Sequence, residues 1–442
     1  MRSFFTAKDF YEIETPILSK GTDEWSREFV VPSRLYSGKA YTLPQSPQQC
    51  KQMIMASWFD KYFQVARCFR DEDDKCDRQP EFTQFDLEMA FVDQETIISL
   101  MTDMLHSLIT TYYPTKKLHP HSFQKITYKD AIEKYGTDKP DIRFWLTMKD
   151  ITAIVAPTDF QVFKQQIQRW WIVKCFKVEQ DLTKKQIEDL TKVAIQAWIG
   201  WLAYITVQPD YLQSPIVKFL GEEVSQKIVE TMDAKIGETI FFSAAQQDIA
   251  NKALDIVRRE VGKILHLYDE DEVAFCRIVD FPMFEKTLTG KRKFTHNPFS
   301  MPQVQHIDNL LKQEKIEEIL AQQYDIVLNG SEIGGWSIRA HLPEILRATY
   351  KTMWYTEEEI AHSIGTMLKA FSYGVPPHGG IALGIDRVLM ILQWEKSLRE
   401  VIAFPKTGAG QDLLRWSPWA MNKKTMSDIH MRIDEYITNQ WV

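Results

Sequence analysis

Hydrophobic and polar positions along this 442-residue chain repeat with two different periods, and each period predicts one kind of element. From Tyr62 to Glu72 the alternation has a period of two, which predicts a strand. The same period returns from Phe82 to Ala90 after a charged loop, so the two segments predict an antiparallel hairpin. Spacings of three and four residues predict helices over 47–56, 94–115, 183–197, 245–262 and 357–371.

One face of the predicted hairpin is unusually polar. A polar face on a sheet is expected either at the floor of a binding site or where the sheet faces water. The pattern alone leaves both interpretations open. The residues that would share this face are Gln64, Arg70, Glu72, Phe82, Gln84, Asp86 and Glu88.

The texture of the sequence changes between residues 140 and 275, where lysine and glutamine become frequent and a strand is expected at 202–207. We therefore divide the chain into a first part at 1–139, an inserted domain at 140–275 and a second part at 276–442. The predicted fold class is α+β, an antiparallel sheet flanked by helices that carries an inserted α+β domain.

The amino-acid composition favours a globular protein without membrane segments. With 44% hydrophobic and 26% charged residues the chain is typical of a soluble globular protein. Its apolar runs stay below the ~20 residues that span a bilayer, so we expect no membrane segment. The five cysteines are scattered without metal-site spacing, which favours a reducing, cytoplasmic setting. A net charge of −7 disfavours a general nucleic-acid coat but allows a local basic patch.

Two arginines are candidates for binding phosphate. Arg70 lies on the hairpin, where it could pair with phosphate oxygens or form a surface salt bridge. Arg387 follows a glycine-rich strand near a helix start, where it could hold a phosphate or form a structural ion pair. Phe82 could stack on a base or belong to the core. The sequence contains neither GxxxxGK[ST] nor a strand–helix GxGxxG, which disfavours the common ATP and NAD folds.

Asp325 and Glu332 are candidates for binding a metal ion. They bracket the Asn329-Gly330 turn, so their carboxylates could converge on one site. Magnesium is often bound through one or two carboxylates together with substrate phosphates. Exposed acidic residues beside a turn are the alternative interpretation.

Taken together and in this order, the segments resemble the bacterial-type aspartyl-tRNA synthetases of class II across nearly the whole chain. The insertion at 140–275 resembles the GAD domain of that family, and the flanking parts resemble its catalytic core. The stretches that carry the resemblance are EIETP at 12–16, LPQSPQQCK at 43–51, QVARCFRDED at 64–73, RQPEFTQ at 78–84, VLNGSEIGG at 327–335, GGIALGIDR at 379–387 and VIAFPKT at 401–407.

The resemblance implies an enzyme that activates L-aspartate with ATP and transfers it to the 3′ end of tRNA(Asp). Whether it also charges tRNA(Asn) stays open. The family further implies a homodimer in the cytoplasm, without contact with a membrane. The alternatives are an adenylate-forming paralogue without tRNA decoding and an inactive relic.

The resemblance also assigns roles in the ATP site. Arg70 would hold the α-phosphate and Arg387 the γ-phosphate, and both would be catalytic. Phe82 and Arg387 would sandwich adenine, and Glu72 would join the site. Mg²⁺ would be bound by Asp325 and by Glu332, which would also be catalytic and contact ATP.

For aspartate, the resemblance implies that Arg339 and Lys51 grip the side-chain carboxylate. Further residues would orient the amino end or close over the substrate. These are Glu24, Ser46, Gln48, Asp86 and His296.

The sequence departs from the family at its start. The N-terminal OB-fold domain, which reads the anticodon in the family, has no counterpart in the sequence, which begins within motif 1. We expect either a shortened gene start or a catalytic core without anticodon reading, with a weaker basis for dimerisation. His296-Asn297 also replaces a pair of histidines.

Tryptophan stands at several positions where the family has glycine. The chain holds 18 Gly and 13 Trp, against roughly 31 Gly expected at average usage. Trp336, close to Arg339 in sequence, would fill space that the substrate needs. Our hypothesis is that UGA codons for glycine were read as tryptophan, and the alternative is a pseudoenzyme with a blocked pocket. The positions are Trp25, Trp58, Trp145, Trp198, Trp201, Trp336, Trp354 and Trp394.

Overall fold

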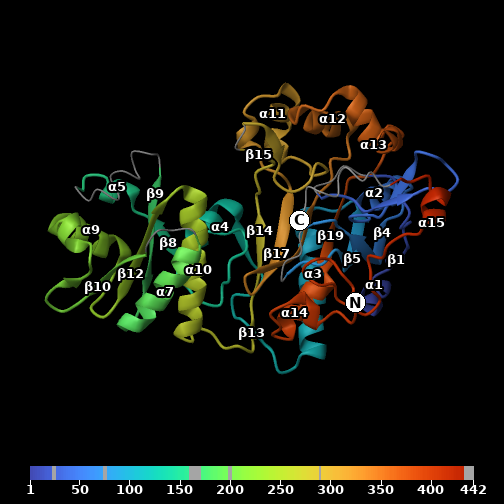
Figure 1. Cartoon of the computed structure of the whole chain (residues 1–442). Helices are drawn as coiled ribbons and strands as arrows, with labels where there is room; N and C mark the ends of the chain where they lie inside the picture. The colour runs from blue at the N-terminus through green and yellow to red at the C-terminus, as the bar shows by residue number, and fades with distance from the viewer. Residues whose placement is uncertain (22–25, 73–76, 159–170, 198–201, 288–289, 433–442) are drawn as a thin grey trace. The chain divides into compact units, whose positions relative to one another are not determined.

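The computed structural model describes residues 1–21, 26–72, 77–158, 171–197, 202–287 and 290–432. Its internal contacts divide the chain into two units (Figure 1). Unit 1 comprises Met1–Leu108, Pro282–Tyr324 and Ile333–Val442, and unit 2 comprises Ile109–Phe281 and Asp325–Glu332. The domain boundaries expected after residues 139 and 275 stay predictions.

Unit 1 contains two long stretches of strands and helices. The first holds α1 (Arg2–Thr6), β1 (Tyr11–Glu12), β2 (Val30–Pro32), β3 (Ala40–Thr42), α2 (Gln48–Ala56), β4 (Lys61–Phe69), β5 (Glu81–Ala90) and α3 (Gln94–Tyr112), which continues into unit 2. The second holds β15 (Phe284–Lys286), β16 (Arg292–Phe294), η1 (Val304–His306), α11 (Ile307–Lys312), η2 (Ile316–Glu318), β17 (Gln323–Leu328), β18 (Ser331–Ser337), α12 (Pro343–Thr352), α13 (Glu357–Phe371), β19 (His378–Gly384), α14 (Ile385–Leu392), η3 (Leu398–Glu400) and α15 (Lys423–Asp428).

Unit 2 holds shorter strands and several amphipathic helices. Residues of β17 and β18 are shared between the two units. The elements of unit 2 are β6 (Lys117–Leu118), β7 (Gln124–Thr127), α4 (Tyr128–Tyr135), β8 (Met148–Asp150), α5 (Thr152–Val155), β9 (Ile172–Val178), α7 (Lys184–Gln196), β10 (Ala203–Val207), β11 (Leu212–Gln213), α8 (Val217–Leu220), α9 (Glu222–Met232), β12 (Thr239–Ala245), α10 (Gln247–Ile264), β13 (Glu272–Val273) and β14 (Phe275–Val279).

The largest sheet has eight strands in the order β1-β4-β5-β19-β18-β17-β14-β7. The central pairs β4–β5, β5–β19 and β18–β19 are antiparallel, whereas β1–β4 and β14–β7 are parallel. The predicted α+β class is confirmed, but the sheet is mixed rather than wholly antiparallel. The two parallel pairs join segments that are far apart in sequence, so the local pattern could not predict their direction.

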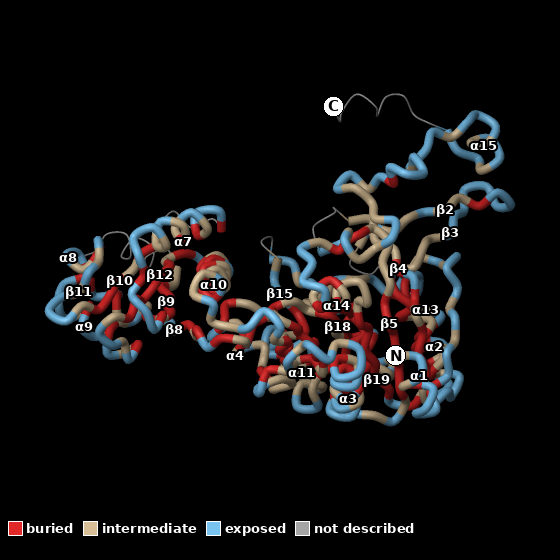
Figure 2. The backbone as a smooth tube through the Cα atoms, turned by 90° about the horizontal axis from the view of Figure 1, so that it is seen from below, coloured by how far each residue is buried: buried red, intermediate tan, exposed pale blue. Residues whose placement is uncertain are grey.

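The β4–β5 hairpin forms as predicted, and its register brings the polar residues together. Gln64 pairs with Asp86, and Cys68 pairs with Phe82, so the polar residues of both strands share one face. Gln64, Asp86 and Glu88 on that face are buried, which rules out the interpretation that this part of the sheet faces water. Figure 2 shows buried residues (red) gathered along β4, β5 and β19.

Apolar side chains fill the opposite face of the hairpin. The rings of Phe5, Phe63 and Phe85 pack together, with the centroids of Phe5 and Phe85 4.8 Å apart and those of Phe63 and Phe85 5.5 Å apart. Helix α3 adds Ile97, whose Cδ1 approaches Gly379 of β19 so closely that a Cβ there would crowd it. Packing of this density holds the strands, and hence their polar faces, in fixed positions.

Unit 2 has its own five-stranded sheet in the order β11-β10-β12-β9-β8. One face packs on α7 and α10, where Phe176 and Phe241 meet Leu190 and Leu254. The other face packs on α5 and α9, around residues such as Val173. The two apolar faces follow from the period of two along β9 and β12. Helix α7 begins where the sequence predicts, and a capping box between Thr183 and Gln186 stabilises its first turn.

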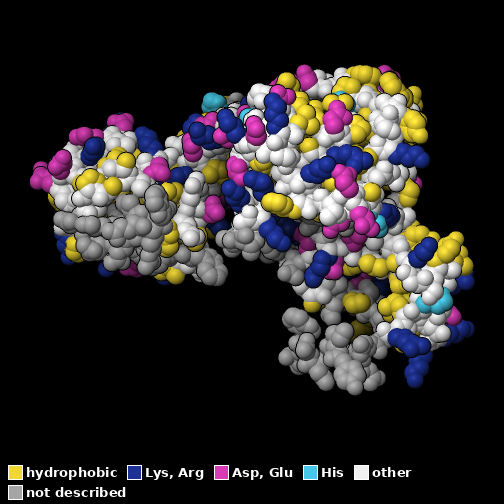
Figure 3. Space-filling model, turned by 90° about the horizontal axis from the view of Figure 1, so that it is seen from above, with side chains coloured by type: hydrophobic (Ala, Val, Ile, Leu, Met, Phe, Trp, Pro, Cys, Tyr) yellow, Lys and Arg dark blue, Asp and Glu magenta, His cyan; other side chains and the backbone are white. Residues whose placement is uncertain are grey.

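Charged side chains of both signs are mixed on the surface. Figure 3 shows Lys and Arg interspersed with Asp and Glu on the visible face, so the net charge of −7 does not form a single acidic patch there. Within the described residues, no helix combines the length and apolar character needed to cross a membrane.

Candidate functional site

Four charged side chains form a fully buried cluster in unit 1. Lys51, Asp86, Glu88 and Arg339 all have 0% exposure. The Lys51 ammonium lies 2.5 Å from Asp86 Oδ1 and 3.2 Å from Glu88 Oε2. Arg339 donates from Nε to Glu88 Oε1 at 2.8 Å and from Nη2 to Oε2 at 3.1 Å. The structure thus brings together Lys51, Asp86 and Arg339, three of the residues expected to bind the amino-acid substrate.

The positions of these side chains follow from the elements that carry them. Asp86 and Glu88 are two residues apart on β5 and therefore share a face. Lys51 comes from α2, and Arg339 follows β18. Gly380 of β19 lies opposite Glu88, where a Cβ would overlap a carboxylate oxygen of Glu88. Glycine is therefore required at 380 for Glu88 to reach Arg339.

The surroundings shift the pKa values of Asp86 and Glu88 in opposite directions. Burial raises the pKa of Asp86 to about 6, with Lys51 opposing the shift. Burial also opposes ionisation of Glu88, but Arg339 and Lys51 outweigh it and lower the pKa of Glu88 to about 2. Glu88 is thus a permanent anion, whereas Asp86 can change its charge near neutral pH.

Trp336 covers both cations. Its ring lies 5.0 Å from Lys51 Nζ and 5.0 Å from Arg339 Cζ, which are cation–π distances. The residue is 8% exposed and belongs to β18. A ring in this place occupies the space over the two cations that an anionic substrate group would use.

The residues expected at the amino end lie at the start of α2. Gln48 is fully buried, and among the described residues neither atom of its amide has a hydrogen-bond partner. Burying an amide without partners costs free energy, which supports a ligand group there. Ser46 is buried, and its Oγ accepts from the Gln48 N–H at 3.3 Å. Glu24 lies outside the described residues.

Glu88 and Tyr62 have roles that the sequence did not reveal. Glu88 was placed on the correct face but was assigned no function, although it holds Arg339. Tyr62 donates from its hydroxyl to Gln64 Oε1 at 2.9 Å, and burial raises its pKa strongly. Gln64 also accepts from Thr15 at 3.0 Å, which ties the N-terminal segment to the hairpin. The one available signal was a glutamate on the polar face of the strand, two residues after Asp86.

Arg70 and Glu72 lie beyond the strand on which they were expected. Strand β4 ends at Phe69. The Arg70 N–H still donates to Pro80 O at 2.8 Å, but proline has no N–H to return the bond, so the ladder stops there. The Arg70 guanidinium lies 4.9 Å from the centroid of the half-buried Phe82 ring. Glu72 accepts from Arg78 at 2.7 Å. Arg70 and Phe82 therefore form one stacked surface, and Glu72 is occupied by an ion pair.

Arg387 lies in the first turn of α14, as predicted. Its Nη2 donates to Asp77 O at 3.1 Å. The neighbouring Asp386 accepts from the Thr83 N–H at 2.9 Å, which ties α14 to β5 beside Phe82. The segments that carry Phe82 and Arg387 are thus side by side although they are 300 residues apart in sequence.

Asp325 and Glu332 both belong to unit 2 and lie on β17 and β18. Asp325 is 2% exposed, and Glu332 is half-buried, so neither is a freely exposed turn acid. Lys139 Nζ lies 3.2 Å from Glu332 Oε2. Burial disfavours the Lys139 ammonium, but Glu332, Asp138 and Asp325 outweigh it and raise its pKa. Among the described residues no group of three or more His, Cys, Asp or Glu could hold a metal.

His296 follows β16 in a half-buried bend. The adjacent Asn297 is buried and accepts from the Phe299 N–H at 3.0 Å and from Ser300 Oγ at 3.2 Å. Ser300 bridges to Arg339 through the backbone. Asn297 thus ties the turn that carries His296 to Ser300, and Ser300 pairs with Arg339 of the buried cluster.

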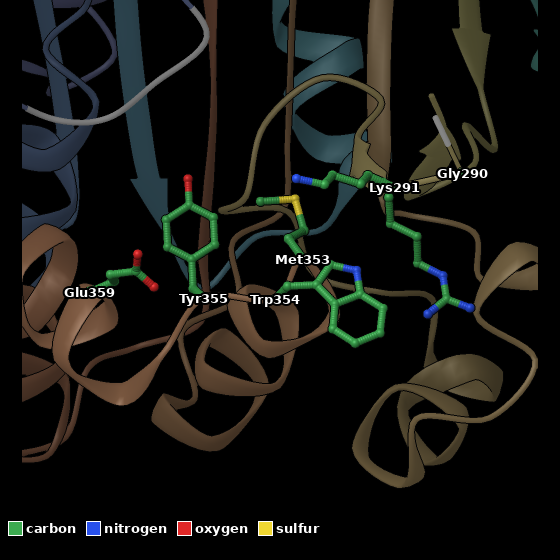
Figure 4. Close-up of a pocket in the computed structure, with 7 residues that line it drawn as sticks. Gly290, Lys291, Met353, Trp354, Tyr355 and Glu359 are labelled. Atoms are coloured by element: carbon green, nitrogen blue, oxygen red, sulfur yellow. The ribbon is translucent and has the colours of Figure 1, made fainter. Parts of the chain in front are cut away.

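A separate pocket of about 410 Å³ lies elsewhere in unit 1. Figure 4 shows the Lys291 side chain extending above Met353, with the Trp354 ring below. Gly290, Arg292, Tyr355 and Glu359 complete its lining. None of the residues expected to bind substrate or nucleotide belongs to this lining.

Comparisons with known proteins identify the family of the chain. The family model described as tRNA synthetases class II (D, K and N) matches residues 1–408. An aspartate–tRNA(Asp/Asn) ligase of Hydrogenobaculum sp. (strain Y04AAS1) is 44% identical over 98% of this chain and 74% of the relative. That of Aquifex aeolicus (strain VF5) is 42% identical with the same coverage, and an aspartate–tRNA ligase of Macrococcus caseolyticus (strain JCSC5402) is 39% identical over 98% of this chain and 73% of the relative.

Proposed function

The chain belongs to the class II tRNA synthetases (D, K and N), and we propose that it is an aspartate–tRNA ligase. It activates L-aspartate with ATP and transfers the aspartyl group to the 3′ end of tRNA(Asp). The observation that carries the choice of amino acid is the buried cluster of Lys51, Arg339, Asp86 and Glu88.

Charge balance in this cluster favours aspartate. With both carboxylates ionised, two cations and two anions cancel. The α-carboxylate is directed at ATP and is left out of this count. The rest of aspartate adds one ammonium and one side-chain carboxylate, so the balance is kept inside a site of low dielectric. The carboxylate would take Lys51 and Arg339, and the ammonium would take Asp86. Asparagine would add an uncompensated positive charge and lysine two, and uncompensated charges are costly in a buried site.

The first chemical step needs positioning rather than a protein nucleophile. An α-carboxylate oxygen of aspartate attacks the α-phosphorus of ATP, and the bond to the bridging oxygen breaks so that pyrophosphate leaves with the electron pair. Arg70, stacked on Phe82, would stabilise charge at the α-phosphate, and Arg387 would hold the γ-phosphate. A ribose hydroxyl of the tRNA terminus then attacks the carbonyl carbon, and AMP leaves.

We propose that Asp325 and Glu332 hold Mg²⁺. Two carboxylates supply the hard oxygen ligands that this ion prefers. Glu332 already attracts a cation, the Lys139 ammonium at 3.2 Å, and Mg²⁺ would have to displace this charge from the carboxylate. When bound, Mg²⁺ would neutralise phosphate charge.

The remaining parts of the proposal concern partners and setting. We propose that 140–275 is a GAD-like domain, supported by its self-contained sheet of β8 to β12. We further propose a cytoplasmic homodimer that binds the acceptor end of tRNA. Several of the similar proteins are named for tRNA(Asp/Asn), which supports testing tRNA(Asn) as a second acceptor.

The test is aspartate-dependent exchange of pyrophosphate into ATP by W336G, beside the chain as written, followed by charging of tRNA(Asp) and tRNA(Asn). W336G is used because the Trp336 ring covers Lys51 and Arg339. Exchange with aspartate that is at least tenfold above exchange with asparagine or lysine is expected. Preference for asparagine or lysine would overturn the choice of amino acid. Exchange without charging of either tRNA would instead favour an adenylate-forming paralogue.

A further inference from the structure

Three helices of unit 1 end in the same unusual way. Helices α2, α12 and α14 are each followed, one residue after the C-cap, by a tryptophan. These residues, Trp58, Trp354 and Trp394, have φ angles of 65°, 69° and 61°. All three therefore lie in the left-handed region, which bulky side chains rarely adopt.

The hydrogen bonds at the three helix ends identify one motif. In each, the tryptophan N–H donates to the carbonyl three residues back, and the next N–H donates to the carbonyl five residues before it. This pair of bonds defines the Schellman motif, in which the left-handed residue is usually glycine. The bonds are Trp58 to Met55 (2.9 Å) and Phe59 to Ile54 (3.4 Å), Trp354 to Lys351 (2.9 Å) and Tyr355 to Tyr350 (3.3 Å), and Trp394 to Ile391 (3.2 Å) and Glu395 to Met390 (2.9 Å).

Glycine fits this backbone because it has no Cβ to clash with the following carbonyl. Helix α4 shows the ordinary solution, since it ends in Gly136 with φ of 72°. Helices α9 and α10 are followed by Asp233 and His266 at positive φ, and both residue types are enriched in this region. Tryptophan lacks the short polar side chain that makes such residues tolerable.

The three rings do not repay the cost of this backbone by burial. Trp58 is 63% exposed, Trp354 72% and Trp394 40%. A large apolar ring on the surface gains little from the hydrophobic effect. The helix ends therefore favour glycine through their backbone, and rings with 40–72% exposure return only part of the cost of that backbone.

Position 336 suits glycine for a different reason, which is space rather than backbone conformation. Trp336 is buried in β18, and its ring covers Lys51 and Arg339 at 5.0 Å. Glycine at this position would leave the two cations open to a ligand carboxylate. The three helix ends suit glycine through their positive φ, whereas position 336 suits glycine because a side chain there covers Lys51 and Arg339.

We infer that positions 58, 336, 354 and 394 are glycine positions of this molecule, and that residue 336 decides whether a carboxylate reaches Lys51 and Arg339. Tryptophan at all four places has one common explanation, a UGA codon that specifies glycine and was read as tryptophan. The part that concerns residue 336 rests on the proposed function, whereas the part that concerns the helix ends does not.

The first test measures stability and is independent of activity. The full chain is compared with W58G, W354G and W394G, singly and combined. Each substitution should raise the melting temperature of unit 1 by roughly 2 °C per site. W354G is the cleanest, because W58G also loses the ring contact with Phe91.

W419G is the matched control, because Trp419 is 62% exposed but has no positive φ, and it should not raise the melting temperature. Unchanged or lower melting temperatures in the three variants would overturn the inference for the helix ends.

The second test measures binding of aspartate, asparagine and lysine to W336G and to the chain as written. W336G should bind aspartate at least 100-fold more tightly, and W419G should bind it no better than the unmodified chain. Tighter binding of asparagine or lysine instead would overturn the proposed substrate but keep residue 336 as the gate. Folded W336G that gains affinity for none of the three would overturn the gate.

The third test reads the residues directly. Peptides that cover the four positions are sequenced by mass spectrometry from the protein isolated from its natural cells. Glycine at all four is expected. Tryptophan at these positions would overturn the explanation by a misread codon.

Discussion

Glu88 holds Arg339 through two parallel hydrogen bonds, at 2.8 and 3.1 Å, and both side chains are fully buried. The pair fixes the plane of the guanidinium that is proposed to receive the substrate carboxylate. Lys51 shares the same glutamate at 3.2 Å, so one anion orients both cations of the site.

Removing the charge of Glu88 should therefore be severe. E88Q keeps the shape of the side chain but leaves Arg339 with an uncompensated buried charge. We expect a loss of about 3–5 kcal/mol in the free energy of unfolding, measured by urea denaturation. E317Q is the control, since Glu317 pairs with Arg292 on the surface and should cause no measurable change. A loss below about 1 kcal/mol in E88Q would show that the cluster is not held by this ion pair.

Aspartate binding should depend on pH through Asp86. The folded pKa of Asp86 is about 6, above its usual value of 3.8. Below pH 6 the carboxyl is neutral and cannot pair with the substrate ammonium, so affinity should fall by about tenfold per pH unit. Calorimetric titration of W336G between pH 5 and 8 would measure this. His378 cannot cause the same inflection, because burial lowers its pKa to about 4.

The pH dependence of folding stability that Asp86 causes is opposite to that of aspartate binding. Between its unfolded pKa of 3.8 and its folded pKa of about 6, the folded state binds more protons than the unfolded state. The contribution of Asp86 to stability is therefore present at low pH and is lost as pH rises through 6. D86N should abolish this loss and the inflection in aspartate affinity. An inflection near pH 6 that persists in D86N would assign it to another group.

Helices, the hairpin with its polar face and the fold class could be predicted because each depends on short-range information. The capping boxes at Thr183 and Thr356 and the alternation along β5 are visible in a few residues. The end of β4 at Phe69 was missed, since it depends on the bond from Arg70 to Pro80 across the loop. The bond between Glu88 and Arg339 joins residues 251 apart, so no local pattern could indicate a partner for either.

Lys139 should compete with Mg²⁺ for Glu332. Its ammonium lies 3.2 Å from the carboxylate, and nearby acids raise its pKa, so it stays charged. Added to W336G, K139A removes this competing cation and should lower the Mg²⁺ concentration for half-maximal pyrophosphate exchange several-fold. K134A, which breaks an exposed pair with Asp130, is the control and should leave it unchanged. An unchanged Mg²⁺ requirement in K139A would argue against Glu332 as a ligand.

Trp416 offers a prediction at a position that the comparison with family glycines did not single out. It has φ of 57°, is 80% exposed, and lies in a turn closed by two backbone hydrogen bonds between Asp412 and Ser417. If left-handed tryptophans mark glycine positions generally in this chain, W416G should stabilise the fold by about 1 kcal/mol. W416A is the decisive comparison, because it removes the same ring but keeps a Cβ. Stabilisation by glycine and not by alanine would assign the effect to the backbone, whereas equal gains would assign it to loss of an exposed ring.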